Sequence, residues 1–334
     1  MSGTIVHGGG ITQAAAQFGG RPEDWLDLST GINPCPLPLP DMPASVWNRL
    51  PDRHLVDAAT QAAARYYDTG RNLPLPVPGT QSVIQLLPRL AIPERRVAIF
   101  GPTYGEYAST LTTAGFEIDM ITSTHGVSRD HGLVVLVNPN NPTGRAFSVS
   151  EVEDIRRTVV GHGGMLLVDE AFGDQQPELS MARHRPDMTG LIVFRSFGKF
   201  FGLAGLRLGF VIAADPVTDR FRDWLGPWAV SGPALFLAAA LMKDDVSAAI
   251  SASILKRKAA LDLILQGAGV RVSGGTALFS LVEHDKAFDL HAHLCRAHIL
   301  TRRFDYQPRW LRIGLAPDRA GDTRLADALR NSDL

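Results

Sequence analysis

The chain lacks several features that would assign it at once to a broad class. Acidic and basic residues nearly balance, with a net charge of −1, so no basic surface for nucleic acid or an anionic membrane is expected. The only cysteines, Cys35 and Cys295, lie far apart without metal-ligand spacing. We expect no disulfide framework, no metal site and a reducing cytoplasm. The longest strand-like apolar run, LVVLV at 133–137, is too short to span a bilayer, and the N-terminus does not resemble a signal peptide.

The composition is that of a soluble globular protein. Of 334 residues, 45% are apolar and 20% are charged, which suggests about two domains. From about residue 50 to 215, short apolar strands alternate with helical patterns. Strands are expected at 96–100, 117–121, 133–138, 165–170, 191–196 and 206–213, and helices at 104–115 and 148–162. Because these strands are apolar on both faces, we expect an α/β fold with a mainly parallel sheet covered on both sides.

The pattern changes after about residue 230. Helices are expected at 234–242 and 245–266, a glycine-rich turn at 273–277, strands at 278–284 and 310–316, and a further helix at 287–298. We therefore divide the chain into a large α/β domain at 46–230 and a smaller α+β domain at 231–334. Residues 1–45 form an N-terminal arm expected to pack with the small domain or across the cleft. Its proline-dense part, 33–43, excludes a helix.

Lysine is scarce, and one lysine lies in an unusual place. The chain has five lysines, and Lys199 is in FRSFGKFFGLAGLRLGF, which otherwise resembles a buried strand and a tight turn. A buried lysine has a lowered pKa, and its neutral amine is nucleophilic toward a carbonyl compound. The alternative is a strand-end lysine whose ammonium group extends to water. Ser196 and Arg207 lie close in sequence and are suited to bind a phosphate.

Other polar or aromatic residues follow strands of the same expected sheet. They are Asp169 in LLVDEAF, Asn141 in NPNNPTG, Tyr104 in GPTYGEY and the glycine turn that opens PGTQSVIQL at 78–86. Each has an ordinary alternative, such as an ion-paired aspartate, a chain reversal or a core aromatic. Together they gather at the carboxyl ends of parallel strands, where open α/β sheets bind ligands. An anion site, an amine, a carboxylate, an amide and an aromatic ring are the groups that pyridoxal phosphate requires.

The stretches NPNNPTG, VDEAF and SFGKFFGLAGLRLG, in this order and spacing, resemble the fold-type I pyridoxal-phosphate enzymes. The branch is that of histidinol-phosphate aminotransferase, with the aspartate aminotransferase-like fold. Within it, HGGGITQAA (7–15), LDLSTGINP (26–34), VDEAFGD and GPWAVS (226–231) resemble the L-threonine-O-3-phosphate decarboxylases of cobalamin biosynthesis. Two alternatives stay open: an aminotransferase of the histidinol-phosphate type, and a non-catalytic binding or regulatory protein of this fold. The latter would be expected to lack Lys199 or Asp169.

The resemblance implies a role for each residue at the cofactor. Lys199 would bind pyridoxal phosphate covalently and move protons, Asp169 would pair with the pyridine nitrogen, and Tyr104 would stack on the ring; these three are the expected catalytic residues. Phe172 stands where most aminotransferases of the branch have a tyrosine. The expected cofactor-binding residues are Gly79, Thr80, Gln81, Tyr104, Asn141, Asp169, Phe172, Ser196, Lys199 and Arg207.

The resemblance also implies substrate contacts. Arg312 in WLRIGL would bind the substrate α-carboxylate, and Asn33 lies in a segment that touches the same group in relatives. The alternative for Arg312 is a surface ion pair. For the phosphate of the substrate, the candidates are His7 with the Gly8–Gly9 backbone, and Arg302.

One position departs from the family pattern. Leu50, in NRLPDRH, stands where relatives have a tyrosine that reaches the cofactor phosphate of the partner subunit. Tyr66 and Tyr67 are the candidates to replace it. By resemblance, the protein is expected to be a homodimer.

Overall fold

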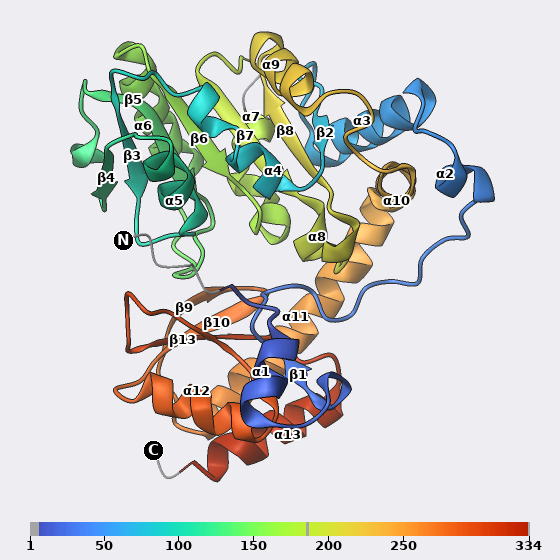
Figure 1. Ribbon diagram of the computed structural model, residues 1–334, viewed down its shortest axis with the longest axis vertical. Coiled ribbons are helices and arrows are strands. Elements are labelled where there is room, and N and C mark those ends of the chain that lie inside the picture. The colour runs from blue at the N-terminus through green and yellow to red at the C-terminus, as the bar shows by residue number, and fades with distance from the viewer. Residues whose placement is uncertain (1–6, 185–186, 333–334) are drawn as a thin grey trace.

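The computed structural model describes residues 7–184 and 187–332, which form a larger and a smaller lobe (Figure 1). A seven-stranded sheet in the order β2-β8-β7-β6-β5-β3-β4 forms the centre of the larger lobe. Its strands are β2 (Leu75–Val77), β3 (Arg96–Phe100), β4 (Ile118–Ile121), β5 (His131–Val137), β6 (Met165–Asp169), β7 (Leu191–Ser196) and β8 (Gly209–Ala213). Only β8 runs antiparallel to its neighbours. The prediction of a mainly parallel sheet is confirmed.

Helices cover both faces of this sheet because its strands are apolar on both sides. Along β5, Val134 and Leu136 belong to one hydrophobic cluster, and Leu133 and Val135 to the other. The first cluster includes residues of α3 (Arg53–Tyr67), α6 (Val149–Gly161), α7 (Met181–His184) and α10 (Gly232–Leu241). The second includes residues of α4 (Thr80–Ile84), α5 (Glu106–Thr113) and α9 (Asp215–Leu225).

Local sequence signals explain two helix and strand boundaries. Ser148 caps α6, because its hydroxyl accepts from the N–H of Glu151 while the Glu151 carboxylate accepts from the N–H of Ser148. The strand expected at 206–213 begins only at Gly209. Residues Ala204–Leu206 form a 3-10 turn, and Arg207 has a left-handed backbone with φ of 53°.

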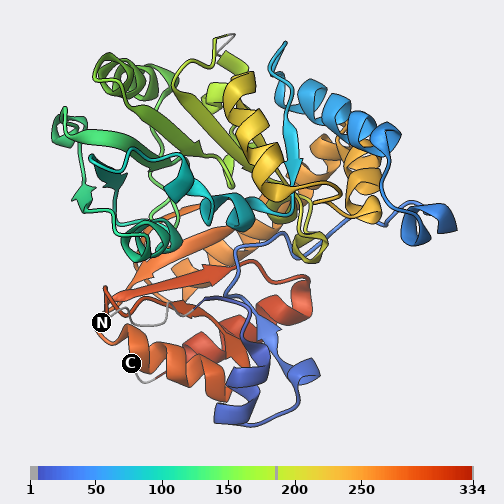
Figure 2. The same cartoon turned by 45° about the horizontal axis from the view of Figure 1, so that its top comes forward.

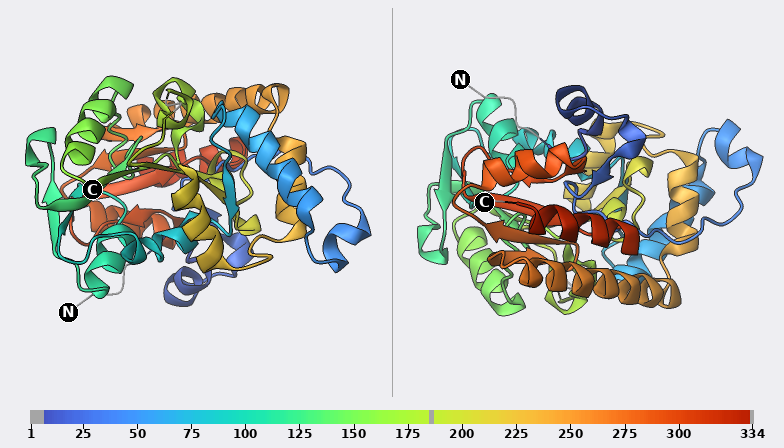
Figure 3. Two further views of the ribbon diagram at one scale, coloured as in Figure 1. Left: turned by 90° about the horizontal axis from the view of Figure 1, so that it is seen from above. Right: turned by 90° about the horizontal axis from the view of Figure 1, so that it is seen from below.

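The smaller lobe contains an antiparallel sheet in the order β12-β13-β10-β9. The strands are β9 (Val272–Thr276), β10 (Phe279–Glu283), β12 (Arg302–Arg303) and β13 (Trp310–Gly314). The helices α11 (Asp244–Gly267), α12 (Ala287–Arg296) and α13 (Arg319–Arg330) lie side by side, as Figure 3 shows from below. Helix α11 runs from the larger lobe into the smaller one (Figure 1).

The N-terminal segment lies against the smaller lobe (Figure 2). Strand β1 (Leu26–Asp27) pairs in parallel with β11 (Ile299–Leu300), and α1 (Ile11–Phe18) packs near α12. The chain then runs in extended form past the junction of the lobes to α2 (Ala44–Asn48), which lies at the outer edge of the larger lobe (Figure 1) and packs against α10 through the buried Val46. The boundaries at 45/46 and 230/231 stay a prediction.

The expected glycine-rich turn at 273–277 is wrong, because Val272–Thr276 is strand β9. Its glycines serve a close approach between the lobes instead. The N–H of Gly275 donates to the carbonyl of Thr143 in the NPNNPTG loop (3.1 Å). A Cβ added at Gly144 would lie 1.7 Å from the Gly275 oxygen, so only glycine fits at this contact.

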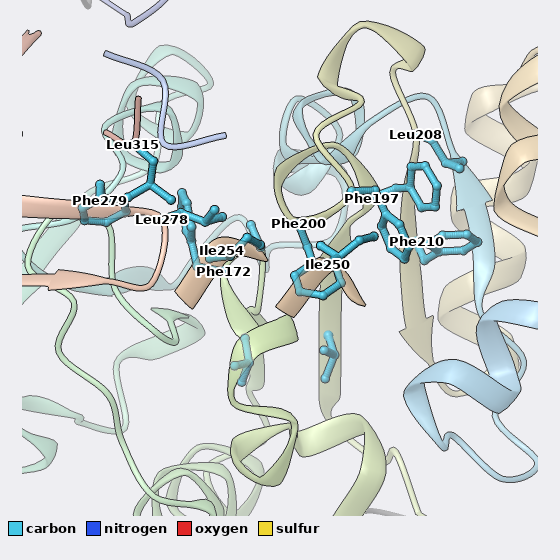
Figure 4. Close-up of a cluster of buried hydrophobic side chains, with 14 of the residues drawn as sticks. Phe172, Phe197, Phe200, Leu208, Phe210, Ile250, Ile254, Leu278, Phe279 and Leu315 are labelled. Atoms are coloured by element: carbon cyan, nitrogen blue, oxygen red, sulfur yellow. The ribbon is translucent and has the colours of Figure 1, made fainter. Parts of the chain in front are cut away.

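Buried apolar side chains continue from one lobe to the other beneath the cleft. In Figure 4, Phe172, Phe279 and Leu278 lie at one end of a row, and Phe197, Phe210 and Leu208 at the other. Between them Phe200 lies beside Ile250 and Ile254 of α11. The two lobes therefore share one hydrophobic cluster, which stabilises their contact.

Candidate active site

All ten residues predicted to bind the cofactor line one cavity of about 140 Å³. They are Gly79, Thr80, Gln81, Tyr104, Asn141, Asp169, Phe172, Ser196, Lys199 and Arg207. Nine of them lie at the carboxyl ends of β2, β3, β5, β6 and β7 or shortly after these ends. Because β8 runs in the opposite direction, Arg207, two residues before it, lies at the same edge of the sheet. The roles of these residues stay predictions, while their gathering is an observation.

Lys199 lies in the short helix α8 (Phe197–Phe200), directly after β7. Desolvation, aided by the nearby cations of Arg312 and Arg207, lowers the pKa of its ammonium group to about 8. Its Nζ lies 5.8 Å from the centre of the Phe172 ring. The lowered pKa makes the neutral amine, which a nucleophile or proton carrier requires, more accessible than for an exposed lysine.

Asp169 ends β6 and is 4% exposed. Burial raises the pKa of its carboxyl group, while hydrogen bonds from the hydroxyl of Tyr107 (2.7 Å) and the N–H of Ala171 (3.0 Å) oppose that shift. Tyr107 was not among the predicted site residues. Its place three residues after Tyr104 in GPTYGEY also fits a core aromatic, so the sequence carries no signal that separates the two roles.

A tight turn brings the phosphate-binding candidates together. Gly79 has φ of 76°, and a Cβ added there would lie 2.7 Å from a guanidinium nitrogen of Arg207. Glycine is therefore required for Arg207 to reach the cavity across the start of α4. Ser196, the last residue of β7, pairs with Gly209 of β8 at the same edge. An anion placed here would meet a hydroxyl and a guanidinium group.

The NPNNPTG loop is held by hydrogen bonds between side chains and backbone. The amide of Asn138 bonds in both directions to Phe147, and the amide of Asn140 donates to the carbonyl of Pro102 (2.9 Å). This leaves the Asn141 amide at the cavity, where its Oδ1 accepts from Arg312 (2.6 Å).

Arg312 is 6% exposed and has no carboxylate partner within residues 7–184 and 187–332. One guanidinium nitrogen donates to Asn141 and another to the carbonyl of Ser29 (2.5 Å), while Nε has no partner in the described chain. The group also lies over the Phe279 ring. Burial, with Arg302 nearby, lowers the pKa of the Arg312 guanidinium to about 10. The expected alternative, a surface ion pair, is wrong, and the arrangement suits an incoming carboxylate.

A larger cavity of about 570 Å³ adjoins the first. Four of the six predicted substrate residues line it, namely His7, Gly8, Arg302 and Arg312, and Lys199 lies where the two cavities meet. Gly9 does not line it. Asn33 does not either, because its amide side chain bonds to the main chain of Phe200 and Cys35. The structure therefore shows Asn33 as a support for the loop at Lys199.

Tyr66 and Tyr67, the candidates to replace the tyrosine that is missing at Leu50, both make contacts within this chain. The Tyr66 hydroxyl donates to Asp174 of the same chain (3.2 Å), and Tyr67 is buried against Phe210. Leu50 itself is exposed, two residues beyond α2.

The donors and the shape of the smaller cavity fit pyridoxal phosphate. The cavity is lined by the Lys199 amine, whose pKa is lowered, by the buried Asp169 carboxylate, and by the Asn141 amide and the Tyr104 ring. The turn at Gly79 and the Arg207 side chain close one end of it. Among described residues, no three His, Cys, Asp or Glu side chains gather as metal ligands, and no helix is long and apolar enough to cross a membrane. Fold and site together define an enzyme that depends on pyridoxal phosphate.

The chain belongs to the aminotransferase class I and II family, whose model matches residues 41–329. It is 64% identical over 334 residues to a threonine-phosphate decarboxylase from Sinorhizobium sp, covering 100% of both chains. It is 42% identical to a threonine-phosphate decarboxylase from Pseudomonas aeruginosa, covering 97% of each. The fold is similar to that of histidinol-phosphate aminotransferase from Sinorhizobium meliloti in complex with pyridoxal-5'-phosphate. The TM-score is 0.83 at 20% identity, with 98% of this chain and 95% of that one covered.

Proposed function

We propose that the protein decarboxylates L-threonine O-3-phosphate to (R)-1-aminopropan-2-yl phosphate and CO2, with pyridoxal phosphate as cofactor, as a step of cobalamin biosynthesis. One observation carries the proposal. Two guanidinium groups without ion-pair partners in the described chain, Arg312 and Arg302, line one cavity beside the Lys199 amine. An amino acid with two anionic groups complements this arrangement. The names of the relatives at 64% and 42% identity support the same substrate.

The chain's own residues would bind both the cofactor and the substrate. Lys199 would hold the cofactor, with Ser196 and Arg207 at its phosphate. When bound, the cofactor supplies an electron sink for the pair left when a bond to the substrate Cα breaks. Asp169 would hold a proton at the pyridine nitrogen, which strengthens that sink, and the Tyr104 ring would fix the cofactor plane.

Arg312 would set which bond at Cα breaks. Held by Asn141 and the Ser29 carbonyl, its guanidinium group would bind the substrate carboxylate and fix its orientation at Cα. After CO2 has left, the Lys199 ammonium group would deliver a proton to Cα and become the neutral amine. Phe172 has no hydroxyl to donate to the cofactor oxygen, and its ring packs edge-on against Phe279.

Incubation of the holoenzyme with L-threonine O-3-phosphate tests this proposal. We expect stoichiometric CO2 and an amino-alcohol phosphate, and neither product from Lys199→Ala. The aminotransferase alternative instead predicts a keto acid without CO2 and conversion of the cofactor to its amine form. That outcome would overturn the decarboxylase assignment and leave the cofactor assignment intact.

We further propose a cytoplasmic homodimer. Trp47 of α2 is 65% exposed and Leu50 is 66% exposed, at the outer edge of the larger lobe (Figure 1). Exposed apolar side chains of this size suit burial against a second copy. Cys35 and Cys295 are free thiols, which fits a reducing compartment. Sedimentation should show a dimer for the native protein and a shift toward monomer for Trp47→Glu; a native monomer with full activity would contradict the proposal.

A further inference from the structure

A carboxylate lies at the rim of the otherwise cationic cleft. Glu106, the first residue of α5, has a side chain that is 15% exposed. One of its oxygens lies 2.8 Å from Nε2 of His7, and the other accepts from the amide of Gln81 (2.8 Å). The oxygen of the same Gln81 amide accepts a hydrogen bond from the Tyr104 hydroxyl (3.0 Å). Glu106 therefore connects the N-terminal arm to the ring expected to stack on the cofactor.

Residues 7–9, the strap, are fixed at both ends. At one end His7 contacts Glu106 on the larger lobe. At the other end the N–H of Gly9 donates to the hydroxyl of Ser29 (2.8 Å), beside β1. Between them Gly8 passes so close to Ser29 that an added Cβ would lie 2.4 Å from its carbonyl oxygen. The strap thus crosses the cleft and forms one wall of the substrate cavity.

We infer that Glu106 is a positioning residue that determines specificity for a phosphorylated substrate, an inference that rests on the proposed function. By holding His7 and the strap over the cavity, it places the imidazole and the Gly8 backbone opposite Arg302. A phosphate bound there meets donors from both lobes, whereas an unphosphorylated amino acid uses only Arg312. Glu106 lines neither of the two cavities and acts through His7.

Kinetics of the holoenzyme test the role. Loss of a charge-assisted contact in Glu106→Ala should raise KM for L-threonine O-3-phosphate about tenfold, with kcat within about threefold of the native value. Glu106→Gln keeps one acceptor oxygen and should show a smaller effect. His7→Ala should match Glu106→Ala, and the double variant should be no worse than either single one, because the two residues act as one unit. Glu117→Gln, on an exposed glutamate paired with Arg96, is the matched control and should leave KM unchanged.

Hydrogen exchange of the substrate-free holoenzyme gives a readout independent of turnover. Amides of the peptide that contains Gly9 should exchange faster in Glu106→Ala than in the native protein or in Glu117→Gln. Unchanged exchange and KM in Glu106→Ala, or multiplicative effects of the two single variants, would overturn the inference. If the native enzyme releases no CO2, the proposed function fails. Faster exchange in Glu106→Ala would then still show that Glu106 holds the strap in place.

Discussion

The hydroxyl of Tyr107 donates a hydrogen bond of 2.7 Å to Oδ2 of Asp169 beneath the floor of the cofactor cavity. Tyr107 is fully buried, and burial raises the pKa of its phenol well above the ordinary value, so it stays a donor at every working pH. The same ring packs edge-on against Tyr104 at 6.3 Å. One side chain thus contacts both Asp169, which we propose pairs with the pyridine nitrogen, and Tyr104, which we propose stacks on the cofactor.

We expect Tyr107→Phe to weaken cofactor binding by about tenfold, because a buried carboxylate loses a donor and its ionised form becomes less stable. Fluorescence titration of the apoenzyme with pyridoxal phosphate measures the change. Tyr67→Phe is the matched control, since the buried Tyr67 hydroxyl has no partner in the described chain and its loss should not weaken binding. Equal affinity in both variants would argue against the positioning role of Tyr107.

The lowered pKa of Lys199 predicts how cofactor capture depends on pH. Only the neutral amine reacts, so its fraction in the apoenzyme should rise as pH increases through about 8. The rate at which the visible absorption of the lysine-bound cofactor appears should follow the same curve. Arg312→Leu removes a nearby cation and should move the midpoint upward, whereas Arg312→Lys keeps the charge and should leave it near 8. A midpoint that is the same in both variants would exclude the electrostatic cause.

A buried ionic network below the site should dominate stability in the larger lobe. Arg195 is 2% exposed and pairs with Glu170 (2.8 Å) and Asp174 (3.1 Å). Arg195→Met leaves two buried carboxylates without their cation and should lower the free energy of unfolding by about 3–5 kcal/mol. Urea denaturation measures this. Adding Glu170→Gln and Asp174→Asn to Arg195→Met should restore much of the lost free energy of unfolding. If stability does not recover, the loss comes from altered packing rather than from the unpaired carboxylates.

The contact between the NPNNPTG loop and β9 predicts opposite effects for two glycine substitutions. Gly144→Ala places a Cβ against the Gly275 backbone at a φ of 71° and should cost about 2–3 kcal/mol of stability. Gly161→Ala, at the end of α6, meets no atom within 4 Å and should stabilise by up to about 1 kcal/mol. Thermal unfolding of both variants provides the comparison, and a neutral Gly144→Ala would contradict the close approach.

The sequence predicts the sheet and the gathering of the cofactor candidates well because both depend on short local patterns. Apolar strands followed by Asp169, Asn141 or Lys199 place these residues at one edge of the sheet. Tyr107 and Glu106 escape prediction because their partners, Asp169 and His7, are far away in sequence. The glycines of β9 led to the wrong prediction of a turn for the same reason. They allow the close approach of Thr143 and Gly144, which are distant in sequence and leave no local pattern.

The reversed direction of β8 also bears on how the site can assemble during folding. Ser196 and Gly209 pair directly, so Ser196, Lys199 and Arg207 all belong to one short connection between neighbouring strands. Closing such a connection costs less conformational entropy than joining Ser29 to Arg312, which are 283 residues apart. The part of the cofactor site that Ser196, Lys199 and Arg207 form can therefore assemble from one continuous stretch of chain. The substrate half requires the two ends of the polypeptide to meet.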